Sequence, residues 1–349
     1  MEGAVYHIPA MLKETIEGLA IKPDGVYVDV TFGGGGHSRA ILREMDNGNP
    51  PKLADKNEGK LYSFDQDIDA FANAKQLKDD SLELKEVGKL KVESCEFFNN
   101  PHWEFVHSNF RYLRNWMDYY GVTEIDGLLA DLGVSFHHFD CPERGFSFRF
   151  SAPLDMRMNQ TAKRTAADIV NGYSEEELAK IFWLYGELKN GRGIARNICK
   201  TRAQKPIERT EELVAAALKN QPSMVDGKEI EVPTNAKKDL ARLFQALRIE
   251  VNDEMGALRE MLVAARDLLK PGGRIAILTY HSLEDRLVKN FLRSGNLEGT
   301  IEKDFYGNAL TPFDVIEKGR EACADEVERN PRARSAKLRV AEKRAVSKP

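Results

Sequence analysis

The chain has 349 residues, of which 42% are hydrophobic and 30% are charged, and this composition excludes general disorder and fibrous folds. At roughly 100–200 residues per domain, the length predicts two domains or one domain with a large insertion. The first residues lack the pattern of a signal peptide, and no apolar run approaches the roughly 18 residues of a membrane span, so we expect a cytoplasmic protein without membrane contact. The cysteines at positions 95, 141, 199 and 323 form no C-x-x-C pair, and no zinc or other metal site is expected.

Basic residues gather in two segments, although the net charge is −4 from 51 basic and 55 acidic residues. Residues 329–349 carry eight basic residues and one acid, 8 − 1 = +7. Residues 192–209 carry six basic residues and one acid, 6 − 1 = +5. Local basic patches on a mildly acidic protein can bind a phosphate backbone. The alternative is solvated helix faces and a peripheral tail, and either segment taken alone favours that alternative.

The first part of the chain alternates short apolar strands with helical stretches. Strands are predicted over residues 25–30, 60–65, 103–107 and 125–131, and a helix over 38–45. Strands that alternate with helices are typical of a parallel sheet with right-handed crossovers.

The pattern changes between residues 141 and 239, where helices and loops are predicted but no strand. Further along, a long amphipathic helix is predicted over 240–269, a strand over 274–280 and a last edge strand over 337–341. We therefore expect an α/β sheet domain made of residues 1–140 and 240–349. An all-helical domain of residues 141–239 interrupts it.

Four glycines, at positions 33–36, separate the first predicted strand from the following helix. Glycine lets a backbone approach a ligand closely, and a helix N-terminus offers amide donors, so this segment favours ligand binding over a plain turn. It is not a complete dinucleotide fingerprint, because Ser38 stands where the third glycine would be. Asp65 ends the second strand, where an acid can accept hydrogen bonds from the ribose hydroxyls of a nucleoside cofactor; a surface-turn acid is the alternative.

Asp131 ends the fourth predicted strand, and ligands of doubly wound sheets bind at this edge. A carboxylate there can accept a hydrogen bond from an amine. The Lys270–Gly273 turn before the next strand resembles methyltransferases that use S-adenosylmethionine. The His281–Asp285 segment contains His, Ser and Asp, but a hydrolase is rejected, because no G-x-S-x-G elbow is present.

Several strings, taken in order, resemble one family closely. They are Tyr6–Leu12, Asp29–Ser38, Asp126–Ser135, Glu143–Phe148, Pro153–Met158, Tyr185–Glu187, Phe244–Asn252, His281–Arg286 and Asn330–Ser335. The chain resembles the bacterial small-subunit ribosomal RNA (cytosine-N4) methyltransferases, the RsmH or MraW family, over nearly its whole length.

This resemblance implies a Rossmann-like, S-adenosylmethionine-dependent methyltransferase sheet with an inserted helical domain for substrate recognition. The implied reaction moves a methyl group from S-adenosylmethionine to the N4 amine of a cytidine in the decoding region of small-subunit (16S) ribosomal RNA. The expected partner is that RNA within a ribosomal subunit, although free RNA is an alternative. Whether the chain forms a homodimer is left open.

The resemblance also implies roles for single residues. Carried over by position, Gly35, Gly36 and His37 line the cofactor, and Asp65 holds its ribose. Phe110 stacks near the adenine, and Asp131 lies beside the methionine end of the cofactor. Where the family has a glutamine shortly after Asp131, this chain has His138, whose imidazole reaches less far and can titrate near neutral pH.

Two questions of role stay open. Asp131 is a candidate catalytic residue, since it can serve the cofactor or receive the cytosine amine. Arg144, Phe146 and Phe148 can grip the target nucleotide through charge and stacking, or they form an internal clamp that packs the inserted domain.

The alternative functions are methylation of a small molecule or of DNA, and a non-catalytic RNA-binding module. A small-molecule enzyme would not need the two basic segments. The intact glycine loop, together with Asp65 and Asp131, argues against a non-catalytic module.

Overall fold

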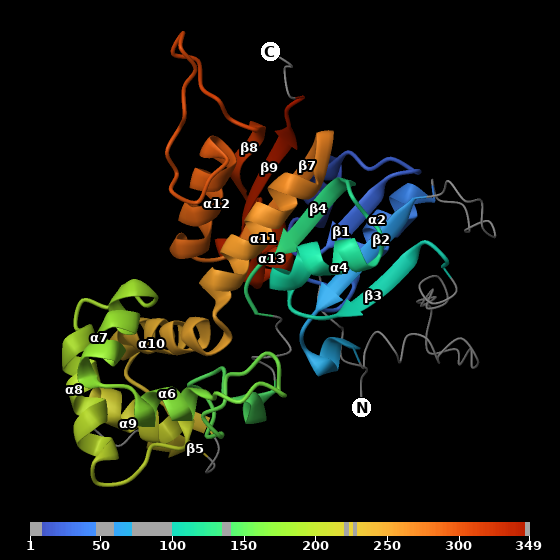
Figure 1. The fold of residues 1–349 in the computed structure, drawn as a ribbon. Coiled ribbons are helices and arrows are strands. Elements are labelled where there is room, and N and C mark those ends of the chain that lie inside the picture. The colour runs from blue at the N-terminus through green and yellow to red at the C-terminus, as the bar shows by residue number, and fades with distance from the viewer. Residues whose placement is uncertain are drawn as a thin grey trace, which may run out of the picture. The chain divides into compact units, whose positions relative to one another are not determined.

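The computed structural model describes residues 9–46, 59–71, 100–134, 141–219, 223–225 and 229–345 (Figure 1). The chain forms two compact units: Met1–Gly133 with Gly256–Pro349, and Val134–Met255. No helix among these described residues is long and apolar enough to cross a membrane.

The first unit is built on a seven-stranded sheet with the order β3-β2-β1-β4-β7-β9-β8 (Figure 1). Its strands are β1 (Val26–Asp29), β2 (Lys60–Asp65), β3 (Trp103–His107), β4 (Ile125–Asp131), β7 (Leu269–Thr279), β8 (Phe313–Glu321) and β9 (Lys337–Lys343). The five strands from β3 to β7 are parallel, while β9 runs antiparallel to both β7 and β8. If these seven strands are numbered along the chain, their order is 3-2-1-4-5-7-6. It differs from the doubly wound order 3-2-1-4-5-6 only by the antiparallel seventh strand, β9, which lies between the fifth and the sixth.

Helices pack on this sheet and bury its apolar side chains. They are α1 (Leu12–Leu19), α2 (Gly36–Met45), α4 (Leu113–Tyr119), α11 (Glu254–Leu268), α12 (Ser282–Ser294) and α13 (Ala324–Arg329), with short 3-10 turns η2 (Phe110–Tyr112) and η4 (Pro331–Ser335). Helix α1 packs on β4, β7 and β9, and α12 packs on β7, β8 and β9. The core includes Leu19, Leu61, Leu129 and Leu338, which are drawn from α1 and three strands. Continuous apolar strands of this kind are typical of parallel sheets that are covered on both faces.

The second unit is mainly helical. It contains η3 (Pro142–Arg144), α6 (Ala166–Gly172), α7 (Glu175–Leu184), α8 (Gly191–Arg202), α9 (Thr210–Leu218) and α10 (Thr234–Asn252), with the short strands β5 (Ser223–Val225) and β6 (Glu229–Glu231). Capping boxes begin α6 at Thr165 and α7 at Ser174, where each side chain accepts a hydrogen bond from the third helical residue. The helices meet in one core that includes Ile169, Phe182 and Leu213.

The four strands predicted in the first part of the chain are present, but the later elements differ from the prediction. The single helix expected over 240–269 is two helices, because Asp253 takes the left-handed conformation with φ 47° and ends α10. Asp tolerates this conformation better than most residues. The strand expected over 274–280 begins earlier, at Leu269, and a register shift against β4 accommodates the Pro-Gly-Gly turn.

Three further expectations are corrected. The segment 337–341 is not an edge strand, because β8 pairs with its outer side and takes the edge. The inserted unit is not all-helical, since β5 and β6 pair as a two-stranded antiparallel sheet. The compact unit spans 134–255 rather than 141–239, because it includes α10, which packs against α6, α7 and α9.

Candidate active site

Polar side chains from far-apart segments meet at the carboxyl edge of the parallel strands. Asp29, Asp65 and Asp131 are the last residues of β1, β2 and β4, and Tyr280 directly follows β7. The register aligns these ends, since Asp29 pairs with Ser63 of β2 and Asp131 pairs with Leu278 of β7. This edge is where open α/β sheets bind their ligands.

The glycine loop lies between β1 and α2. Gly33 and Gly35 have φ of 53° and 75°, which L-residues rarely adopt. A Cβ on Gly36 would lie 2.2 Å from Cγ of Pro9, whereas a Cβ on Gly33 would meet nothing within 4 Å. Helix α2 begins at Gly36, and no side chain of the described residues caps its N-terminus. The loop therefore offers open space at Gly33 and backbone donors at a helix start, which suits an approaching ligand.

Asp65 fixes the glycine loop against β2. Its Oδ2 accepts the backbone N–H of Gly33 at 2.9 Å, and its Oδ1 accepts the N–H of Asp67 at 2.9 Å. The structure thus brings the predicted ribose-binding acid next to the predicted loop, although 32 positions separate them.

Asp29 is a site residue that sequence reasoning did not single out. It is fully buried, and its carboxylate accepts the Ser38 hydroxyl at 2.6 Å and the Thr31 N–H at 3.0 Å. Ser38 also bonds Ser63 of β2 at 2.7 Å, so this network ties β1, β2 and α2 together. Burial raises the pKa of Asp29 to about 6, against the opposing effect of these hydrogen bonds. The available signal was an acid that ends an apolar strand just before the glycines.

Asp131 lies between Tyr280 and His37. The Tyr280 hydroxyl donates to Oδ1 of Asp131 at 2.7 Å, and Nδ1 of His37 lies 3.6 Å from Oδ2. The backbone N–H of Asp131 donates to Oγ1 of Thr31 at 2.6 Å, and this bond links the end of β4 to the loop that follows β1. The Asp131 side chain is 14% exposed, and His37 is only 4% exposed. Burial raises the pKa of Asp131 to about 7; the Tyr280 hydrogen bond lowers it, while the charges of Asp29 and Glu284 raise it further.

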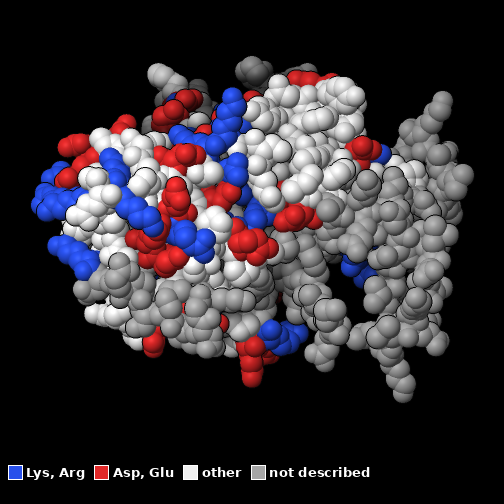
Figure 2. All heavy atoms as spheres, turned by 90° about the horizontal axis from the view of Figure 1, so that it is seen from below, with Lys and Arg blue, Asp and Glu red and all other residues white. Residues whose placement is uncertain are grey.

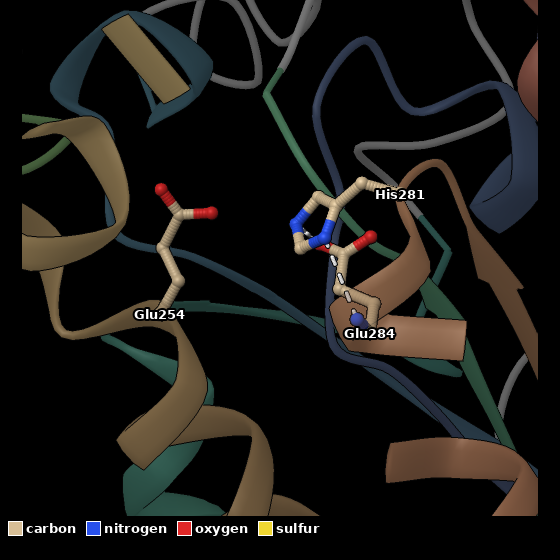
Figure 3. A group of neighbouring side chains, drawn as sticks. All are labelled: Glu254, His281 and Glu284. Carbon is tan, nitrogen blue, oxygen red and sulfur yellow. Dashed lines mark hydrogen bonds and ion pairs between the residues drawn. The ribbon is translucent and has the colours of Figure 1, made fainter. Parts of the chain in front are cut away.

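The start of α12 adds a fourth acid, Glu284, to this edge. His281 caps the helix, and its Nε2 lies 3.1 Å from Oε1 of the buried Glu284, toward which it points (Figure 3). Oε2 of Glu284 accepts the backbone N–H of Tyr280 at 3.0 Å. Glu254, also drawn in Figure 3, belongs to the second unit and there forms a two-pronged ion pair with Arg248.

Asp285, the acid of the rejected hydrolase triad, is bonded to Arg339. The guanidinium of Arg339 donates to both of its carboxylate oxygens, at 2.8 and 3.1 Å. Burial alone would raise the pKa of Asp285, but the hydrogen bonds and charge of Arg339 outweigh it and lower the pKa. His281 faces Glu284 rather than a Ser–Asp pair, so the segment forms a helix cap and a buried ion pair.

Phe110 begins η2, separated from the end of β3 by two residues, and is partly buried. Beside it, the Asn109 side chain accepts the N–H of Arg111 and donates to Oε1 of Gln66 at 2.7 Å, which connects the ends of β3 and β2. Phe110 therefore follows the strand next to Asp65, as a residue near the adenine would require. His138 lies outside the described residues.

Comparison with known proteins identifies the family. The family model described as "MraW methylase family" matches residues 4–344. The chain belongs to the MraW methylase family.

Full-length relatives agree with this match. "Ribosomal RNA small subunit methyltransferase H" of Bacteroides fragilis is 51% identical over 344 residues, 98% of this chain and 99% of the relative. The proteins of the same description from Parabacteroides distasonis and Cytophaga hutchinsonii are 52% and 47% identical, over 97% of this chain and over 97% and 100% of their own lengths. Among solved structures, an rRNA methylase from Streptococcus thermophilus aligns over 97% of this chain and 99% of its own at 12% identity and a TM-score of 0.36, a level too low to support a conclusion.

In the second unit of this methylase, the three residues with two open roles make contacts inside that unit. Arg144 is 8% exposed, and its guanidinium donates to the carbonyl oxygens of Arg157 and Met158. Phe146 is 4% exposed in the unit's core, with Arg144 over its ring. Phe148 packs edge-on against Phe244, with ring centroids 5.7 Å apart. Of the two roles left open by the sequence, these contacts favour the internal clamp.

The basic segment of residues 329–349 is largely used by the fold of this methylase. Arg339 is 6% exposed and bonded to Asp285, Lys337 pairs with Glu321, and Lys343 donates to the carbonyl of Arg266. These three residues lie in β9 and are bonded within the fold, which favours the alternative of a structural segment, and RNA binding by the segment stays a prediction. Arg334 is exposed.

The segment of residues 192–209 is more accessible. It runs from α8 to the start of α9, and most of its cations are exposed. Arg196, Lys205 and Arg209 pair with nearby acids, whereas Arg192 and Lys200 have no partner among the described residues. Lys and Arg are interspersed with Asp and Glu on the face drawn in Figure 2.

Proposed function

We propose that this methylase transfers a methyl group from S-adenosylmethionine to the exocyclic N4 amine of a cytidine in small-subunit ribosomal RNA. The observation that carries the proposal is the match, at 51–52% identity over 97–98% of the chain, to relatives described as ribosomal RNA small subunit methyltransferase H. The geometry of the sheet edge supports it, because a glycine loop, a ribose-type acid and a buried acid meet there.

The residues at this edge fit S-adenosylmethionine. The open space at Gly33 admits a close backbone approach, and the Asp65 carboxylate suits a pair of ribose hydroxyls. Gly35, Gly36 and His37 would line the cofactor at the start of α2, with Phe110 near the adenine. The bound cofactor supplies an electrophilic methyl group on a positively charged sulfonium. The carboxyl groups of Asp29 and Asp131 lie at this edge, and a cationic sulfonium nearby would favour their ionised forms.

Asp131 is the residue best placed to handle the amine. The lone pair of a cytosine amine is delocalised into the ring, so the amine is a poor nucleophile and it must lose a proton as the new N–C bond forms. A carboxylate that accepts one N–H orients the amine and can take that proton. The pKa of Asp131, raised to about 7 by burial, suits a general base near neutral pH. Asp131 can also hold the amino group of the cofactor.

The substrate cytidine must be unpaired or leave its stack to reach a buried carboxylate. We propose that the inserted unit, Val134–Met255, recognises the RNA through its exposed cations, of which Arg192 and Lys200 lack an acidic partner among the described residues. The assembled small subunit in the cytoplasm is the proposed substrate.

A methyl-transfer assay tests this function. The purified chain is incubated with S-adenosylmethionine carrying a labelled methyl group and, in parallel, with free cytidine, naked small-subunit RNA and small subunits from a strain that lacks the gene. Digestion to nucleosides and mass spectrometry then locate the label. We expect N4-methylcytidine from the subunits and little from free cytidine. Label on another base, or none in any RNA sample while cofactor binds, would overturn the proposal.

A further inference from the structure

We infer that Tyr280 is a positioning residue for the proposed methyl transfer: its hydroxyl occupies Oδ1 of Asp131 and thereby assigns Oδ2, on the His37 side, to the reacting amine or the cofactor. The inference rests on the proposed function and extends it to a residue that neither the motifs nor the family resemblance had marked.

The backbone around Tyr280 holds the phenol in place. Tyr280 directly follows β7, whose last residue Thr279 is buried, and the N–H of Tyr280 is bonded to Glu284 in the first turn of α12. The ring packs against the core of the sheet unit. A side chain fixed at both its backbone and its ring can direct its hydroxyl with little freedom, so the 2.7 Å bond to Asp131 is preorganised.

Asp131 is held from its other side as well. Its backbone N–H is bonded to the hydroxyl of Thr31, and that hydroxyl lies 3.3 Å from Oδ1 of Asp29, to which it donates. The main chain of Asp131 is therefore fixed by Thr31 in the loop after β1, and its side chain by Tyr280, the residue after β7. Because Oδ1 already accepts the Tyr280 hydroxyl, Oδ2, which lies 3.6 Å from Nδ1 of His37, is the oxygen with more acceptor positions left for a ligand.

The charges around Asp131 show how the Tyr280 hydroxyl affects the pKa of this carboxyl group. The titratable groups that face it are Asp29 from β1, Glu284 from α12, His37 from α2 and Tyr280 itself. Burial and the two acids favour the protonated carboxyl, while the Tyr280 hydrogen bond opposes them. Without that bond the pKa of Asp131 rises, and a smaller fraction of the enzyme carries the acceptor carboxylate at neutral pH.

Two conservative variants test the inference. Tyr280→Phe keeps the ring and removes the hydroxyl. Tyr27→Phe is the matched control, because Tyr27 is a buried tyrosine of β1 in the same unit, and its hydroxyl accepts the N–H of Lys22, a residue that precedes that strand. For each protein we would measure the pH profile of kcat and of kcat/KM on small subunits, and the calorimetric affinity for S-adenosylmethionine between pH 6 and 9.

We expect the acid limb of the Tyr280→Phe rate profile to move up by about one pH unit, the usual effect of losing a hydrogen bond to a charged group. Its rate at pH 7 should then fall roughly fivefold and recover to within about twofold at pH 9. The affinity for the cationic cofactor should weaken at low pH in the same way. Tyr27→Phe should leave both profiles in place.

A loss of rate in Tyr280→Phe that is equal at every pH, or profiles that superimpose on the wild type, would overturn the inference and leave Tyr280 a packing residue. The pH profile of cofactor affinity, measured by calorimetry, tests the role of Tyr280 without any RNA. A wild-type protein that binds the cofactor but methylates no RNA would therefore overturn the proposed function and not this inference.

Discussion

Replacement of Asp131 by Asn should stabilise the ligand-free protein while removing its activity. Asn has nearly the shape of Asp, and its side-chain oxygen can still accept the Tyr280 hydroxyl, while the backbone bond to Thr31 is untouched. What changes is the charge, because the buried carboxylate near Asp29 and Glu284 is replaced by a neutral amide. Buried like charges destabilise the folded state, so their removal is favourable.

The size of this effect follows from the raised pKa of Asp131. Its value in the folded protein is about 7, against an ordinary 3.8 in the unfolded chain. The stability associated with the protonated form is therefore fully present below pH 3.8 and is lost as the pH rises through 7. At about 1.4 kcal/mol per unit, this interval sets an upper limit of about 4 kcal/mol. Coupling to Asp29 spreads the titration over both acids, so we expect a gain of about 2 kcal/mol at pH 8.

The gain in stability is measured by urea unfolding of the wild type and of Asp131→Asn without cofactor. The measurement is repeated at each pH unit from 4 to 8. The difference in free energy of unfolding should be small at pH 4, grow up to pH 7 and level off above it. Turnover on small subunits should fall by orders of magnitude. A constant difference across the range, or a less stable variant at pH 8, would refute the view that Asp131 is a strained, buried charge.

Three further predictions concern the cofactor loop and the basic segments. Asp65→Ala should weaken S-adenosylmethionine binding by about 2–3 kcal/mol in calorimetry, since a charged acceptor is lost; unchanged affinity would remove Asp65 from the site. Gly33→Ala should also lower cofactor affinity, because its methyl group enters the open space beside the loop, and it should lower stability, because φ of 53° strains a residue with a Cβ. Thermal unfolding with and without cofactor separates the loss of affinity from the loss of stability. Arg339→Gln should lower the free energy of unfolding by about 3 kcal/mol, because it breaks a buried ion pair. Arg334→Gln should instead leave stability unchanged, and equal unfolding curves for these two variants would contradict the assignment.

Local patterns were sufficient for the elements around the candidate site. The strands that end at Asp29, Asp65 and Asp131 are short apolar runs, and such runs are recognised from neighbouring residues alone. The glycines at 33–36 mark the loop for the same reason. Because the carboxyl ends of parallel strands share one edge, placing these strands also brought the acids and the loop together.

The remaining features depend on long-range contacts. Tyr280 and Asp131 are 149 positions apart, and no local pattern indicates that their side chains meet. Strand β8 was missed because it is largely exposed and polar, so that its pairing with β9, rather than an apolar run, defines it. The helix break at Asp253 was hidden by an apolar pattern that continues on both sides, since local propensity is a weak signal against a long periodic stretch.

The position of β9 has a consequence for how the protein is made. This strand is among the last elements of the chain, yet it lies between β7 and β8 and buries Leu338 and Val340. During synthesis the sheet cannot close until residue 343 has left the ribosome, and until then β7 presents an open edge and β8 lacks its partner. Unpaired edges of this kind invite pairing with other nascent chains. Truncation before Lys337 is therefore expected to yield an aggregating chain rather than a shortened enzyme.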